Sequence, residues 1–110
     1  QLFDLLKGIS EGGKTVYDNT IVLWTNELGN GAGHHGWNVP FVIGGGGGSW
    51  QKGRYLKVRG DVTFTASNGT NTLGGVDAAH NHLLVSVAQQ FGIAADTFSD
   101  KDIVGPLKAL

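Results

Sequence analysis

Two neighbouring stretches decide the fold: DNTIVLWTNELG at residues 18–29 and GHHGWNVPFVIG at residues 33–44. Each contains a short continuous apolar run, one from Ile21 to Trp24 and one from Val39 to Ile43. Runs of this length, rich in β-branched residues and bounded by turn formers, are typical of buried strands in parallel sheets. We therefore expect strands at residues 20–25 and 40–44, side by side and parallel, because the loop between them is too long for a tight hairpin.

The glycine-rich loop between these strands carries the polar side chains most suggestive of function. In open parallel sheets, ligands bind at loops that follow the carboxyl ends of strands. Carboxylate oxygen and neutral imidazole both ligate divalent cations such as Zn²⁺, so Glu27 and one of the two histidines His34 and His35 are candidate metal ligands. We expect Asn26 and Asn38 nearby as ligand-binding residues. The alternative is a loop organised only by hydrogen bonds, with Glu27 capping backbone amides.

Composition narrows the classes of protein. The chain has 110 residues, enough for one domain at most, and its net charge of -1 provides no electrostatic footprint for nucleic acid. No apolar stretch approaches the roughly 20 residues of a membrane span. The absence of cysteine excludes a disulfide scaffold and thiolate metal sites, and it is compatible with a secreted or periplasmic location. Because the chain opens at Gln1 without a leader, we expect it to be part of something longer.

The remaining segments predict a partial α/β domain. Apolar residues between Leu2 and Ile9 fall on one helical face, and Gly12-Gly13 would end that helix. Residues 55–59 and 62–65 resemble a small antiparallel hairpin, residues 66–76 a loop, and residues 95–110 an irregular tail. The best helix covers residues 78–91, with Asp77 as its N-cap. Two central strands cannot form a covered sheet alone, so other segments or chains should complete it.

The helical segment at 78–91 carries an apolar stripe, which should face the sheet. Its members are Leu83, Leu84, Val87, Ala88 and Phe91.

Several further side chains have both a functional and a structural interpretation. Five glycines at residues 44–48 precede Lys52 and Arg54, but a phosphate-binding P-loop needs Gly-Lys-Ser/Thr opening a helix. The glycines are better explained as a turn that lets backbone pass close to a neighbour, and Arg54 stays a ligand-binding candidate.

His80, at the start of the long helix, would bind an anion or cap the preceding loop. Trp24 should be core, whereas Trp37 and Trp50 could form a ligand wall or a subunit contact.

A family resemblance rests on several of these motifs together. The chain is similar to the C-terminal part of the secreted bacterial HXXSHH-motif domain family. The similar residues are Asn19 to Gly31, His34, Asn38 to Gly45, and Gly53 to Leu56. The helix opening at His80-Asn81-His82 and the ending Gly105-Pro106-Leu107 resemble that family's closing helix and tail. The resemblance covers nearly the whole chain except residues 60–76.

That family resembles the alkaline phosphatase and sulfatase superfamily, in which a strand ending in Asp-His-Gly carries metal ligands. Here the corresponding positions are Asn26-Glu27-Leu28-Gly29, so Glu27 and His34, the histidine that matches the family, are the predicted metal ligands. Neither the HXXSHH motif nor a superfamily nucleophile lies in this chain, and no catalytic residue is assigned. The resemblance implies an alkaline phosphatase-like α/β fold, with residues 1–110 as the C-terminal portion of one domain.

Two functions follow as expectations. The first is part of a secreted or periplasmic metal-assisted hydrolase of phosphate or sulfate esters, with Zn, Ca or Mg polarising the ester oxygen. The second is a non-catalytic structural or binding subunit of an envelope or membrane-associated assembly. Isolated residues 1–110 should be unstable or aggregation-prone, because the central strands would have unpaired edges.

Overall fold

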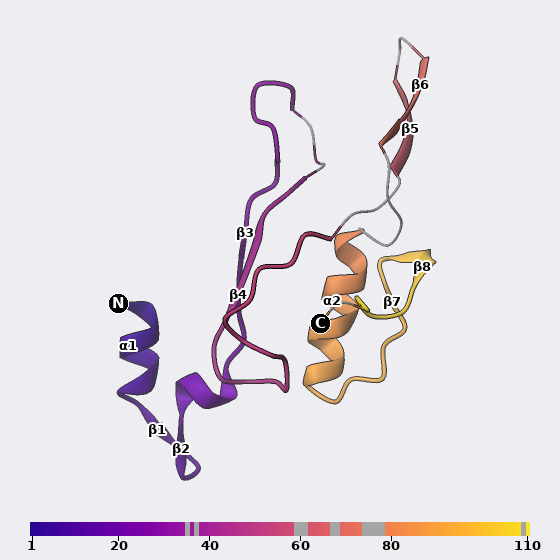
Figure 1. Ribbon diagram of the computed structural model, residues 1–110. Coiled ribbons are helices and arrows are strands. Elements are labelled where there is room, and N and C mark those ends of the chain that lie inside the picture. The colour runs from indigo at the N-terminus through magenta and orange to yellow at the C-terminus, as the bar shows by residue number, and fades with distance from the viewer. Residues whose placement is uncertain (35, 37, 59–61, 67–68, 74–78, 109) are drawn as a thin grey trace. The chain divides into compact units, whose positions relative to one another are not determined.

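A computed structural model describes residues 1–34, 36, 38–58, 62–66, 69–73, 79–108 and 110. The chain divides into two compact units, residues 1–48 and residues 49–110, each of which is described by itself. The first unit contains α1 (Leu2–Lys7), β1 (Ser10–Glu11), β2 (Lys14–Thr15), the 3₁₀ helix η1 (Val16–Asn19), β3 (Val22–Thr25) and β4 (Phe41–Gly44). The second contains β5 (Val62–Ala66), β6 (Gly69–Leu73), α2 (His80–Gln90), β7 (Thr97–Phe98) and β8 (Asp100–Val104) (Figure 1).

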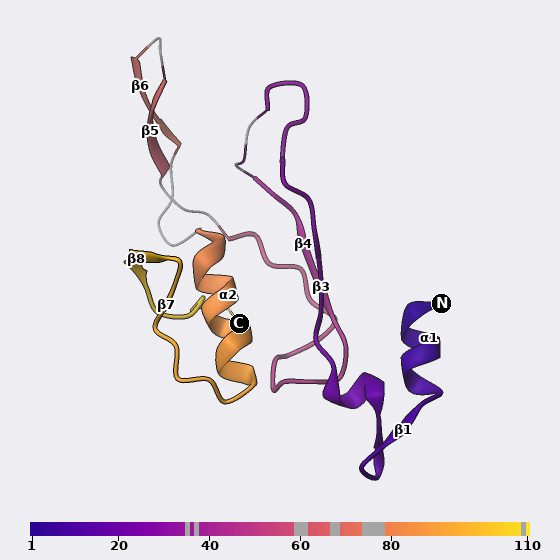
Figure 2. The ribbon, with the colours of Figure 1, turned by 180° about the vertical axis from the view of Figure 1, so that it is seen from behind.

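The two predicted central strands exist, but they are antiparallel. β3 and β4 form a two-stranded ribbon in which Val22 lies opposite Gly44 and Thr25 lies opposite Phe41. Figures 1 and 2 show the two strands running alongside each other below a long connecting loop. A parallel pair needs a crossover, usually a helix, and no helix occurs among the described residues between β3 and β4. The prediction of parallel central strands in an alkaline phosphatase-like layered α/β fold is therefore wrong.

All the sheets in the described residues are small. The strands form four antiparallel pairs, β1–β2, β3–β4, β5–β6 and β7–β8, and each pair is a separate two-stranded sheet. An apolar run shows that a segment is buried or half-buried, but it carries no information on the direction of its partner. The β-branched content of residues 20–25 and 40–44 thus located the strands without determining their pairing.

Other predicted boundaries shift for local reasons. The first helix ends at Lys7, and Gly12 and Gly13, with φ of 55° and 81°, form the turn of the β1–β2 hairpin instead of a helix end. The second predicted hairpin is displaced along the chain, because β5 pairs with β6 and residues 55–58 form no strand. The predicted loop at 66–76 therefore includes a strand.

The tail predicted to be irregular folds back as the β7–β8 hairpin, with Ser99 at φ 67° between the strands.

The long helix α2 lies within the predicted range 78–91, but it buries a different face. Its N-cap is Ala79, and the predicted cap Asp77 lies outside the described residues. The buried residues are Asn81, Leu83, Val85 and Ser86. From the predicted apolar stripe, only Leu83 is buried, and Phe91 is 57% exposed. Two polar side chains thus replace apolar ones on the buried face, which requires hydrogen-bond partners for both.

In the first unit, the glycine run makes the closest contact. Gly46 N–H donates to Tyr17 O at 2.7 Å, and Gly47 N–H donates to Thr20 O at 3.0 Å. An added Cβ at Gly45 would meet Thr20 O, and one at Gly46 would lie 2.5 Å from the Asp18 Cα. The run is therefore a backbone-to-backbone contact that side chains would block, as the sequence predicts.

The glycine run contacts the short helix η1 and the residue that follows it, and several interactions fix the position of η1. Thr15 and Asp18 form a capping box, in which Thr15 N–H donates to Asp18 Oδ2 at 2.9 Å and the Thr15 hydroxyl donates to the same oxygen at 2.7 Å. The Thr20 hydroxyl donates to Val16 O at 2.6 Å at the other end. Phe3 of α1 meets Tyr17 of η1 edge-to-face, with ring centroids 5.5 Å apart. These hydrogen bonds and the ring contact fix η1 in the position where the glycine run packs against it.

Among the described residues, no helix has the length and apolar content needed to cross a bilayer.

Candidate functional site

The predicted site loop begins where β3 ends, and its first residues are held by short-range hydrogen bonds. The Asn26 Oδ1 accepts a hydrogen bond from the Glu27 N–H at 2.8 Å. The Thr25 hydroxyl lies 3.0 Å from Pro40 O and 3.2 Å from Asn26 O, so it ties the two ends of the loop together. Asn26 therefore orients the backbone at Glu27, which is a local structural role for the amide.

The candidate side chains of this loop are exposed. Asn26, Glu27, His34 and Asn38 all face solvent, and His34 and Asn38 adopt left-handed φ values of 50° and 57°. An exposed carboxylate needs no buried partner, so the position of Glu27 does not by itself require a pairing with a histidine. His35 and Trp37 lie outside the described residues. Within the described part of the chain, no group of three or more His, Cys, Asp or Glu side chains could hold a metal ion.

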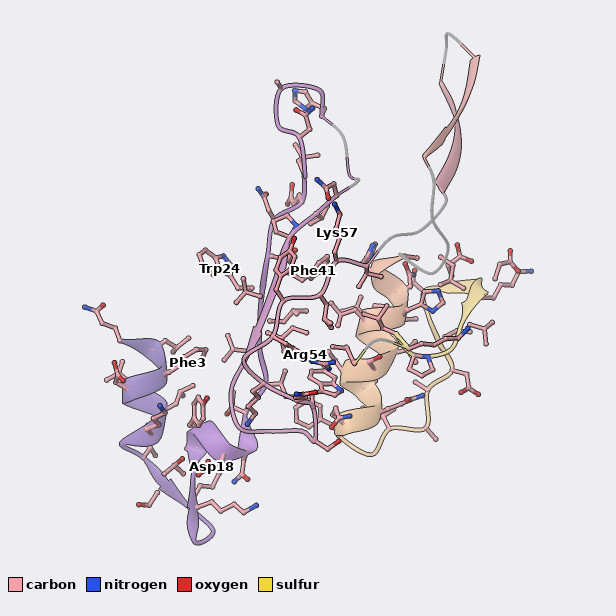
Figure 3. All side chains as sticks on the ribbon, in the orientation of Figure 1. Phe3, Asp18, Trp24, Phe41, Arg54 and Lys57 are labelled. Carbon is pink, nitrogen blue, oxygen red and sulfur yellow. The ribbon has the colours of Figure 1, made fainter. Side chains whose placement is uncertain are left out.

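Trp24, predicted to be core, is 73% exposed. It lies directly opposite Val42 in the ribbon, and Val42 is 55% exposed. Opposite residues of an antiparallel pair lie on the same face, so these two side chains form one apolar surface. Figure 3 shows Trp24 and Phe41 on opposite sides of the ribbon, in agreement with the register. The prediction for Trp24 failed because a two-stranded ribbon has no second layer to cover this face.

The His-Asn-His sequence at the start of α2 separates into different roles. Asn81 is buried and its Nδ2 donates to Phe98 O at 2.6 Å, which holds β7 against the helix. His82 Nδ1 lies 2.8 Å from Gly105 O, and since a carbonyl only accepts, Nδ1 carries the hydrogen. His80 is exposed. Residues 74–78 of the preceding loop, which His80 was predicted to cap, lie outside the described residues.

Sequence reasoning missed the role of Ser86. This buried residue donates from its hydroxyl to His82 O at 2.9 Å and accepts from the Leu107 N–H at 2.8 Å. The second bond spans 21 residues of sequence, so no local pattern could predict it. Together with Asn81 and His82, Ser86 attaches the C-terminal segment to α2.

The second unit contains a cleft of about 460 Å³ that the sequence did not predict as a whole. Its lining includes one predicted ligand-binding residue, Arg54, and the half-buried Trp50, which was expected to form a ligand wall or a subunit contact. The other lining residues are Ser49, Gln51, Ser86, Gln89, Gln90, Pro106, Leu107, Lys108 and Leu110. Because these residues come from three distant segments of the chain, only the folded structure brings them together.

The cleft wall is fixed by hydrogen bonds between those segments. Gln90 Oε1 accepts from the Ser49 N–H at 2.7 Å and lies 3.2 Å from the Ser49 hydroxyl. Arg54 Nε donates to Gln51 O at 3.0 Å, which fixes the plane of the guanidinium. The structure therefore places Arg54 in a cleft, whereas it places Asn26, Glu27, His34 and Asn38 on an exposed loop of the other unit.

No protein-family model matches this chain, and neither the curated proteins nor the solved structures include a significant match.

Proposed function

We propose that this chain is a non-catalytic structural or binding part of a larger assembly, in which a strand from another segment or chain extends the β3–β4 ribbon. The observation that supports the proposal is the exposed Trp24–Val42 pair on a ribbon of only two strands. An isolated two-stranded ribbon is only marginally stable in water. The pair is therefore an apolar surface on an element that needs further support.

The geometry favours a β-strand as the occupant. Within the described residues, neither outer edge of the ribbon pairs with another strand. Such edges carry backbone N–H and C=O groups that a further strand can bond, which is the basis of recognition by strand addition. An added strand would also place a side chain beside Trp24. Burying about 150 Å² of the indole would contribute about 4 kcal/mol to association.

The test is the mass and composition of the native protein. We expect it to occur with partner segments or chains, and Trp24→Ser to weaken that association about 1,000-fold without unfolding the chain. Leu5→Ser is the matched control, since Leu5 is an equally exposed apolar residue of the same unit outside the ribbon. A stable monomer with no partner would contradict the proposal, and so would equal weakening by Leu5→Ser.

A second candidate function is metal-assisted hydrolysis of phosphate or sulfate esters, with Zn, Ca or Mg as the ion. It is favoured by the presence of Glu27 and His34 on one exposed loop, open to ligands supplied by another segment. A metal held there would polarise the ester oxygen and stabilise the charge that develops on it. Asn26 and Asn38 would contribute amide groups to the substrate.

Elemental analysis of the native protein tests this candidate. Glu27→Gln and His34→Ala should each lower the metal content at least twofold and leave the fold intact. His80→Ala is the control, because His80 is also an exposed histidine and belongs to the other unit. Equal metal content in all four proteins would remove Glu27 and His34 from any metal-binding role.

A further inference from the structure

We propose that the cleft of the second unit binds a small ring-shaped organic anion, with Arg54 holding the anionic group and Trp50 packing against the ring. The proposal concerns a different site from the β3–β4 ribbon and does not depend on it. The anionic group is a phosphate or a carboxylate, since each can accept two parallel hydrogen bonds from a guanidinium.

The charge of the lining selects an anion. Arg54 and Lys108 both line the cleft, and no lining residue has an acidic side chain. A cleft lined by cationic side chains and by no acidic ones attracts a negative ligand and repels a positive one. The remaining polar lining consists of neutral amides and hydroxyls, which add hydrogen bonds without changing the sign of the charge.

The hydrogen bonds of the wall prepare Arg54 for this role. Its Nε–H is engaged with Gln51 O at 3.0 Å, so the orientation of the guanidinium is set before a ligand arrives. The terminal nitrogens carry the other four of the five N–H donors of arginine, and a pair of them can bind two oxygens at once. A preoriented group loses less conformational entropy on binding. Figure 3 shows Arg54 beside α2, the helix that supplies Ser86, Gln89 and Gln90 to the lining.

Gln90 is oriented in the same way. Its Oε1 accepts from the Ser49 N–H at 2.7 Å, and this contact assigns the amide so that Nε2 is the group left to meet a ligand. The wall therefore offers a second donor, near the segment that carries Arg54. Gln89 differs, because its Nε2 donates to Ala95 O at 2.9 Å.

Size and shape limit the ligand to a small molecule. A volume of about 460 Å³ lies toward the lower end of the range for small-molecule sites. The half-buried indole of Trp50 adds a flat apolar surface to a lining that is otherwise mostly polar. A ligand with one apolar ring face and several polar groups at its edge, such as an acidic sugar, matches both features.

The experiment is calorimetric titration of the native protein with four probes: glucose 6-phosphate, glucuronate, inorganic phosphate and glucose. We expect glucose 6-phosphate or glucuronate to bind more tightly than inorganic phosphate, and glucose not to bind. The tighter of the two sugars identifies whether the anionic group is phosphate or carboxylate. Equal binding of glucose, or no binding of any anion, would overturn the proposal.

Variants assign the binding to the cleft. Arg54→Gln should weaken the binding of the sugar with the higher affinity at least 10-fold, since a charge-assisted pair of hydrogen bonds is lost. Arg54→Lys keeps the charge without the bidentate geometry and should weaken binding by a smaller factor. Lys101→Gln, an exposed lysine of β8 outside the lining, should change it less than twofold. Equal losses for Lys101→Gln and Arg54→Gln would show nonspecific attraction and contradict the site.

Discussion

Within each of the two units of this protein, a different kind of contact stabilises the fold. In residues 1–48, the tightest contact is backbone against backbone, where Gly45, Gly46 and Gly47 pass over the η1 segment. In residues 49–110, buried side chains of α2 hold the C-terminal segment, and they include two polar ones. All the buried side chains among the described residues other than glycine belong to this second unit. The first unit is thus stabilised by close backbone contacts that only glycine allows, and the second by hydrogen bonds and packing of buried side chains.

The largest expected effect is that of Gly45→Ala. The new Cβ would overlap Thr20 O, and Gly45 has a φ of 101°, which alanine rarely adopts. Both costs together should destabilise the first unit by about 3 kcal/mol. Amide hydrogen exchange measures it, since the amides of Gly46 and Gly47 should exchange about 100-fold faster while those of α2 keep their rates.

Three control substitutions separate the two causes. Gly46→Ala introduces the overlap without a positive φ, Gly12→Ala introduces the positive φ of 55° without an overlap, and Gly31→Ala introduces neither. We expect losses in that order, with Gly12→Ala costing about 1 kcal/mol. If Gly45→Ala behaved like Gly31→Ala, the backbone contact would not stabilise this unit.

An intermediate effect is expected for Val85→Ala in the second unit. Val85 is 0% exposed, and removing two methyl groups from such a site costs about 2 kcal/mol. Exchange should accelerate at the amides of α2 and of Leu107, which are bonded within this unit, and not at those of Gly46 and Gly47. Val104→Ala is the control, since Val104 is 60% exposed and should change stability by less than about 0.5 kcal/mol. Faster exchange in both units would show that the two unfold together.

The smallest effect on stability is expected for Trp24→Ser. Because the indole is largely exposed, its removal should change the stability of the first unit by less than about 0.5 kcal/mol. Amide hydrogen exchange at Gly46 and Gly47 measures this, because these amides are bonded within the first unit, and the same variant should still weaken association in the native assembly. A large acceleration of exchange at these two amides would mean that Trp24 is covered within the chain itself.

Local patterns predicted the elements whose signals are local. The apolar runs at 21–24 and 39–43 located β3 and β4 to within two residues, and helical periodicity located α2. The five-glycine run predicted a close backbone approach, because few other constraints select glycine at successive positions. The candidate site residues Asn26, Glu27, His34, Asn38, Arg54 and His80 stay predictions, and of these Arg54 lines the cleft of the second unit.

Only the tertiary structure decided the direction in which the strands pair and which side chains of α2 are buried. The direction of β4 relative to β3 depends on the course of the connecting loop, and the composition of a strand does not encode that course. The buried face of α2 depends on backbone groups supplied by Phe98 and Leu107, which bond Asn81 and Ser86 and make polar residues better suited to that face than the apolar stripe alone suggests. Sequence periodicity reports the spacing of apolar residues along one segment, whereas a hydrogen bond between distant segments exists only once both are placed.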